Sequence, residues 1–215
     1  MWGFYLTLLI FSIILTLPFL VVFLTVNFFT LAITNLGFST LIGFSIVLAI
    51  LLGSFVNLPL SEKKKVHIED VRFFGVLKRK MKVRKGLSVN LGGAIIPLFV
   101  ASILIPNAPV IPLLVTTVAA ILVSYKSARV IPGVGVSMPP FFTILTIVFF
   151  SIILAPENPE IVAFISGVLG TLIGADLLHL KEVMKTAKST MVIGGSGVFD
   201  GLVLTGILAS LLAGL

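Results

Sequence analysis

Long apolar runs separated by short polar stretches organise the whole chain. No charged side chain occurs from Met1 to Ser61, and later apolar runs are almost as clean. A run of about 20 apolar residues is long enough to cross a bilayer as a helix. The pattern therefore predicts an all-α integral membrane protein, a bundle of about seven transmembrane helices. We expect these helices at residues 2–30, 38–60, 89–105, 110–125, 139–155, 159–180 and 191–215.

Composition supports the same class. Of the 215 residues, 58% are hydrophobic and 11% are charged, whereas an ordinary soluble domain carries about 25% charged residues. Cysteine is absent and there are two histidines, so we expect no disulfide, no metal site and no cofactor. Three parts follow from the pattern: helices 1 and 2 in residues 1–60, a basic loop in 61–88, and helices 3–7 in 89–215.

Lysine and arginine are confined to three polar stretches. Ten of the fifteen lie in residues 61–88. The other five are Lys126, Arg129, Lys181, Lys185 and Lys188. With seven spans, these stretches share one side, and the positive-inside rule makes that side cytoplasmic. We expect a plasma-membrane protein with a cytoplasmic N-terminus, an external C-terminus and lipids as its surroundings. Since orientation accounts for the basic residues, no nucleic-acid partner is expected.

Three polar or glycine-rich stretches are predicted to depart from helix. Alternation around Gly75 within residues 61–88 favours a β-hairpin, with a strip along anionic headgroups as the alternative. Glycine and proline in residues 129–140 predict irregular backbone, which is tolerated at membrane depth only inside protein or beside a wet cavity. The run from Gly194 to Gly197 forms helix poorly, so the last helix is expected to start late or to be broken there.

Two aspartates, Asp176 and Asp200, lie inside apolar helices. A carboxylate in hydrocarbon costs about 2.5 kcal/mol or more, so such residues are candidates for function. Each lies twelve residues from Lys188, in the turn between the last two helices. An antiparallel hairpin would therefore hold the two carboxylates at similar depth.

Glycines accompany both aspartates. On the helix with Asp176 they are predicted to form one ridge for close packing: Gly167, Gly170 and Gly174. At 100° per residue, Asp176 would face away from that ridge. Gly197 lies three residues before Asp200 and would leave space beside it.

Facing aspartates in a low dielectric share a proton, and such a pair can activate water and polarise a peptide carbonyl. The segment GTLIGADLLHL, Gly170 to Leu180, resembles the GxGD region of intramembrane aspartyl proteases, closest to prepilin and preflagellin peptidases. The segment from Gly195 to Leu212 resembles the GxGD helix of presenilin and signal peptide peptidase, although this chain has GxxD. That resemblance implies that Met138, Pro139 and Pro140 stand in for the proline-containing PAL loop, which is itself absent.

A second resemblance covers most of residues 60–215. The pattern GADLL…GGxGxFDGxxLTGI is similar to an uncharacterised family of small archaeal and bacterial membrane proteins, a domain of unknown function. This resemblance implies no activity.

Three functions remain open for the aspartates. They are an aspartyl protease-like dyad that hydrolyses a membrane-embedded peptide, a proton- or cation-coupled transport site, and a structural role. His179 would either tune Asp176 or lie in solvent, and Asn90 would either line a cavity or cap a helix. The expected cavity-lining residues are Gly174, Gly197, Ser196, Asn90, Met138, Pro139 and Pro140. The substrate and the oligomeric state stay open.

Overall fold

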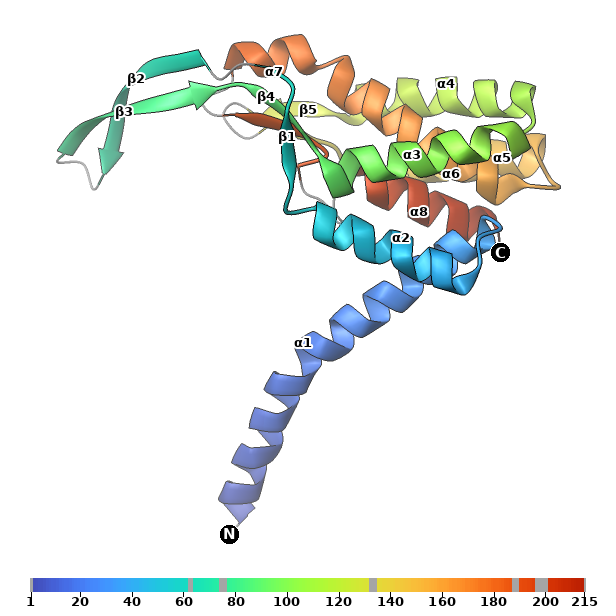
Figure 1. Cartoon of the computed structure of the whole chain (residues 1–215), viewed down its shortest axis with the longest axis horizontal. Helices are drawn as coiled ribbons and strands as arrows, with labels where there is room; N and C mark the ends of the chain where they lie inside the picture. Colours follow the sequence, from blue (N-terminus) through green and yellow to red (C-terminus); the bar gives the residue numbers. More distant parts are fainter. Residues whose placement is uncertain are drawn as a thin grey trace.

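Helices lie side by side in a bundle, and short strands gather at one of its ends (Figure 1). The structure is a computed structural model, and it describes residues 2–61, 64–73, 77–131, 135–186, 190–195 and 201–214. We call the end where β1, β4 and β5 lie the strand end. The C-terminus and the α1–α2 connection lie at the opposite end.

The helices follow the apolar runs. They are α1 (Trp2–Asn35), α2 (Thr40–Gly53), η1 (Leu91–Ile95), α3 (Ile96–Leu104), η2 (Ile105–Asn107), α4 (Val110–Ser127), α5 (Phe141–Leu154), α6 (Pro159–Thr171), η3 (Leu172–Leu177), α7 (Leu180–Thr186) and α8 (Gly201–Ala213). The strands are β1 (Asn57–Pro59), β2 (Lys64–Phe73), β3 (Leu77–Lys85), β4 (Leu87–Asn90), β5 (Arg129–Ile131), β6 (Gly135–Ser137) and β7 (Met191–Ile193).

Seven apolar helical segments are present in the described part, as predicted. Three are long and apolar enough to cross a membrane: Ile14–Asn35, Val110–Ser127 and Pro159–Lys185. The other four are shorter: Thr40–Gly53, Leu91–Asn107, Phe141–Leu154 and Gly201–Ala213. By length, the described helices thus divide into three candidate spans and four shorter segments.

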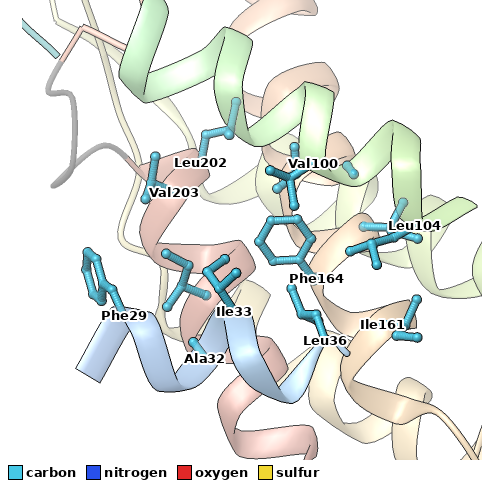
Figure 2. Close-up of a cluster of buried hydrophobic side chains, with 14 of the residues drawn as sticks. Phe29, Ala32, Ile33, Leu36, Val100, Leu104, Ile161, Phe164, Leu202 and Val203 are labelled. Atoms are coloured by element: carbon cyan, nitrogen blue, oxygen red, sulfur yellow. The ribbon is translucent and has the colours of Figure 1, made fainter. Parts of the chain in front are cut away.

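A cluster of apolar side chains joins α1, α3, α6 and α8 (Figure 2). Phe164 of α6 lies in its middle, with Val100 of α3 on one side and Leu36, directly after α1, on the other. The last turns of α1, from Val26 on, are thereby packed into the bundle. The preceding part of α1 extends away from the bundle in Figure 1, and side chains such as Phe19 are exposed there.

Glycines let α6 and η3 approach two different neighbours, which corrects the prediction of a single ridge. A Cβ at Gly167 would lie 2.7 Å from the Gly206 Cα of α8. A Cβ at Gly170 would lie 2.4 Å from the Ala120 Cβ of α4, and one at Gly174 would lie 2.5 Å from the Ile121 carbonyl oxygen. Gly167 and Gly170 both lie in α6, and positions three residues apart differ by about 60° around an α-helix, so α8 meets the first glycine and α4 meets the other two.

Strands take residues from the ends of three predicted helices: residues 57–59 form β1, residues 89–90 belong to β4, and residues 191–193 form β7. Residues 57–59 leave helix and pair with β4 as the antiparallel strand β1. Residues 191–193 form β7, which pairs with β4 in parallel, and helix resumes at Gly201. The late start of the last helix was predicted, but the three-stranded sheet in the order β1-β4-β7 was not.

The predicted hairpin in residues 61–88 is confirmed. Strands β2 and β3 form an antiparallel hairpin, with Lys64 opposite Lys85, and it projects from the strand end (Figure 1). The described residues between 129 and 140 are not helical, as predicted, but the irregular backbone expected there is in part regular: β5 and β6 pair as short antiparallel strands before Met138 and Pro139. Residues 74–76 and 132–134 lie outside the described residues.

Charge separates between the two ends. Lys126 ends α4 at the strand end, and Lys185 lies on α7 at the same end. Glu157 and Glu160 lie at the opposite end, where α5 connects to α6. The spatial arrangement therefore matches the segregation of charge along the sequence.

Candidate functional site

Asp176 lies on the π-helical turn η3, near the strand end of the helical segment Pro159–Lys185, which we call the central helix. The turn is closed by a hydrogen bond from the Leu178 N–H to the Ile173 carbonyl, 3.0 Å across five residues. A π-helical turn is wider than an α-helical one and is often found at functional sites. The turn therefore places Asp176 differently from the position expected at 100° per residue.

A cavity of about 320 Å³ lies beside Asp176. The Asp176 side chain is half-buried at its wall. The other lining residues come from β4, β6, α7 and β7 with its flanking turn: Leu87, Gly135, Val136, Leu180, Val183, Thr190, Met191, Val192, Ile193, Gly194 and Gly195. The structure thus brings one predicted site residue, Asp176, to a cavity at the strand end.

Strand β7 forms one wall of this cavity. It is an edge strand among the described strands, since β4 is its one partner in the β1-β4-β7 sheet. Gly194 ends the strand with φ +66°, a left-handed conformation that favours glycine. A Cβ at Gly194 would lie 2.7 Å from the Gly93 carbonyl carbon. Close approach to η1 therefore fixes the turn by which the chain leaves β7.

His179 bonds to the same π-helical turn that carries Asp176. Its Nδ1 lies 3.2 Å from the Gly174 carbonyl oxygen and 3.0 Å from the Ala175 carbonyl oxygen. The imidazole ring also packs against Tyr125 of α4, with ring centroids 4.8 Å apart. The sequence predicts that His179 either tunes Asp176 or lies in solvent. Neither expectation includes hydrogen bonds to the backbone carbonyls before Asp176.

Asp200 lies outside the described residues, together with Ser196 and Gly197. The next residue, Gly201, begins α8, and a Cβ there would lie 3.7 Å from the Met138 Cε. Strand β6, directly before Met138, packs against η3. Met138 therefore lies beside the first residue of α8, and the strand before it lies against the turn of Asp176.

The remaining predicted residues have structural contacts. Asn90 is fully buried and caps η1: its Oδ1 accepts from the Gly93 N–H at 2.7 Å, and its Nδ2 donates to the Ser54 carbonyl at 2.7 Å. The cap was one of the two roles predicted for it. Pro140 is the N-cap residue of α5, and Pro139 is exposed beside it. Gly174 packs against α4.

Sequence reasoning missed β7 as a wall of the cavity. The signal was local: Met191, Val192 and Ile193 include two β-branched residues and are followed directly by two glycines. Among the described residues, no group of three or more histidines and acidic residues is placed to hold a metal ion. The described side chains at this site offer a carboxylate, Asp176, and a hydroxyl, Thr190, beside backbone amides and apolar walls.

Comparison with known families assigns most of the chain. A model described as "Protein of unknown function (DUF1614)" matches residues 51–212. The chain belongs to the DUF1614 family. The match begins inside α2 and includes the sheet, the cavity and both aspartates, whereas α1 precedes it. No curated protein and no solved structure matches this DUF1614 protein.

Proposed function

We propose that this DUF1614 protein is a multi-pass membrane protein that hydrolyses a membrane-embedded peptide, using Asp176 and Asp200 as an aspartyl protease-like pair. The observation that carries the proposal is the cavity of about 320 Å³ beside Asp176. Its wall includes the glycine turn Gly194–Gly195, from which the chain runs on to Asp200. An isolated acidic residue on the outer surface of a helix would not support this chemistry.

Helix packing supports a pairing of the two aspartates. Helices α6 and α8 cross where Gly167 meets Gly206. Asp176 follows Gly167 by nine residues, and Asp200 precedes Gly206 by six. For two antiparallel helices that cross at this point, the two counts differ by three residues, so the sequence predicts similar depths for the two aspartates. Asp200 itself lies outside the described residues.

The edge strand β7 suits a peptide substrate. An edge strand presents backbone N–H and C=O groups to a further strand, and a helical substrate must become extended before its scissile carbonyl is accessible. In the proposed reaction one aspartate is ionised and the other is protonated. The ionised carboxylate takes a proton from water as the water oxygen attacks the carbonyl carbon, and the carboxylic acid gives its proton to the carbonyl oxygen. The first aspartate then passes its proton to the amine nitrogen as the C–N bond breaks, and the second takes a proton back from the gem-diol to leave the product carboxylic acid.

The exposed apolar surface and the separation of charge support a membrane location. Side chains such as Phe19, Leu41 and Ile111 are exposed on helices that carry few polar groups, which is stable in lipid and costly in water. The basic strand end would face the cytoplasm of the cell, and the end with Glu157 and Glu160 would face outward.

Orientation can be tested with single cysteines, because the chain has none of its own. We expect cysteine at Asn107 or Asn158 to react with an impermeant maleimide in intact cells, and cysteine at Lys82 to react only after permeabilisation. Labelling of all three from outside would contradict the membrane orientation. The reverse pattern would place the cavity on the external side.

The chemical test uses Asp176→Asn and Asp200→Asn in proteoliposomes, with a library of transmembrane peptides at pH from about 4 to 8, the range over which a proton-sharing pair titrates. Each variant should lose at least about 100-fold in cleavage rate, and the double variant should lose little more, since members of one catalytic unit are not additive. Glu160→Gln is the matched control, a carboxylate on the same helix at the opposite end.

Three outcomes separate the candidate functions. Cleavage by the wild type that either variant abolishes supports the proposal. Absence of cleavage together with ion-driven uptake that depends on the aspartates indicates transport. A fall in thermal stability in either variant, with no activity that follows the carboxylates, indicates a structural role.

A further inference from the structure

The π-helical turn ends at a point where backbone carbonyls need partners. The last carbonyl groups of a helix have no N–H donor within the helix, and a histidine side chain near the C-terminus can supply one. Here η3 ends at Leu177, and His179 Nδ1 lies 3.2 Å and 3.0 Å from the carbonyl oxygens of Gly174 and Ala175.

The identity of the partners fixes the tautomer of His179. Carbonyl oxygens only accept hydrogen bonds, so Nδ1 must carry the proton and donate it to both. In the neutral imidazole this leaves Nε2 with its lone pair. The ring is held in that orientation by Tyr125, 4.8 Å away and tilted by 30°.

We infer that His179 is a positioning residue: through Nδ1–H it holds the π-helical turn that presents Asp176 to the cavity. The Ala175 carbonyl belongs to the peptide group that joins Ala175 to Asp176, so its orientation sets the backbone of Asp176 directly. Asp176 and Leu180, which precede and follow His179 in the sequence, both line the cavity. The His179 ring packs against Tyr125. The histidine thus acts through the turn and does not touch the substrate.

The neighbouring helix holds the other side of the same turn. A Cβ at Gly174 would lie 2.5 Å from the Ile121 carbonyl oxygen and 3.1 Å from the Tyr125 nitrogen. Tyr125 therefore contributes both to the backbone surface against Gly174 and to the ring contact with His179. Helix α4 and His179 together clamp η3 in the shape that carries Asp176.

Two substitutions of similar size distinguish this role. The amide nitrogen of asparagine reaches the position of Nδ1, whereas that of glutamine reaches the position of Nε2. Asparagine already makes such a bond in this chain: Asn27 Nδ2 donates to the Phe23 carbonyl, four residues earlier, at 2.8 Å. His179→Asn should therefore preserve the turn, and His179→Gln and His179→Ala should release it.

The first measurement does not depend on catalysis. In a chain with Asp176→Cys as its one cysteine, we measure alkylation by a water-soluble maleimide in the full-length, membrane-reconstituted protein. The labelling rate should rise at least about fivefold with His179→Gln or His179→Ala and stay within about twofold with His179→Asn. Equal rates in all four chains, or a rise with His179→Asn equal to that with His179→Ala, would overturn the inference.

The second measurement rests on the proposed function. With Asp176 in place, kcat for peptide cleavage should fall about 10–100-fold with His179→Gln, because a displaced catalytic group costs that much, while KM changes little and His179→Asn restores the rate. An unchanged kcat with His179→Gln would overturn the positioning role. If the wild type cleaves nothing, the proposed protease function fails, and the labelling measurement still decides the role of His179.

Discussion

Helix α1 and the helix that carries Asp176 are equally apolar but occupy opposite environments. Both Ile14–Asn35 and Pro159–Lys185 are long enough to cross a membrane. Within their apolar 18-residue windows, 6% of the first is buried in the protein and 67% of the second. Hydropathy therefore identifies both as candidate spans without indicating which lies at the centre of the bundle.

Small residues make the difference. The central helix has glycine at 167, 170 and 174, and at each a Cβ would overlap a neighbouring helix. Between Ile14 and Asn35, α1 has none. Close approach through small residues is the main way in which helices pack in lipid, where burial of apolar surface provides little gain.

Polar side chains show the same contrast. In the exposed part of α1, Thr16 and Thr25 donate to carbonyls four residues earlier in their own helix. In α6, the Ser166 hydroxyl bonds to Thr117 of α4 at 3.0 Å, whereas Thr171 donates locally to the Gly167 carbonyl at 2.6 Å. The helix that carries Asp176 thus has a polar side chain that joins two helices, and the hydroxyls of Thr16 and Thr25 bond within α1.

The largest difference should appear when a phenylalanine is removed from each helix. Phe164→Ala should lower the free energy of unfolding by about 3–5 kcal/mol, because Phe164 is 2% exposed and its loss leaves a cavity among α1, α3 and α6. Phe19→Ala, at 74% exposed, should change it by less than about 0.5 kcal/mol. Equilibrium unfolding in detergent micelles measures both, and equal losses would refute the contrast.

A smaller effect is expected from adding one methyl group to a helix crossing. Gly167→Ala should destabilise by about 1–3 kcal/mol, because the new Cβ would meet the Gly206 backbone at 2.7 Å. Gly201→Ala is the control, since its Cβ would make only an ordinary contact with Met138 at 3.7 Å. The control should be neutral or slightly stabilising in the same unfolding assay. A Gly167→Ala protein as stable as the wild type would show that α6 and α8 do not cross at this point.

The smallest effect on the free energy of unfolding should follow from replacing exposed leucines of α1 by alanine. Leu17, Leu20 and Leu24 are each more than half exposed, so their combined replacement by alanine should cost less than about 1 kcal/mol. Labelling of Asp176→Cys in this background should also stay unchanged. A large loss of stability would mean that another protein surface covers this part of α1.

The seven apolar segments could be predicted because hydropathy alone identifies them. The residues at which the helices end could not be predicted in the same way. The apolar run that contains α2 continues past Gly53, and nothing in its hydropathy marks the change to β1 at Asn57. Pro59 was the local signal, but a short apolar stretch fits helix or strand equally well. The partner that decides, β4, lies about thirty residues further along the chain.

Asp176 could be found as a candidate because a carboxylate inside an apolar helix is rare and costly. Its surroundings could not, since they depend on η3. The π-helical turn changes which side of the helix Asp176 occupies, and it reflects contacts of Gly174 with α4 and of His179 with two carbonyls. Such contacts arise from the packed structure and leave no periodic signal in the sequence.

The parallel pairing of β4 with β7 also sets an order of events during synthesis. Leu87 pairs with Met191, and the whole run from α3 to α7 is made between them. While those helices emerge from the ribosome, one edge of β4 stays unpaired, because β7, the strand that pairs with it, has not yet been translated. The wall that β7 contributes to the cavity of Asp176 is therefore among the last parts of the cavity to form, and a nascent chain contains no complete cavity until residues 190–195 have been made.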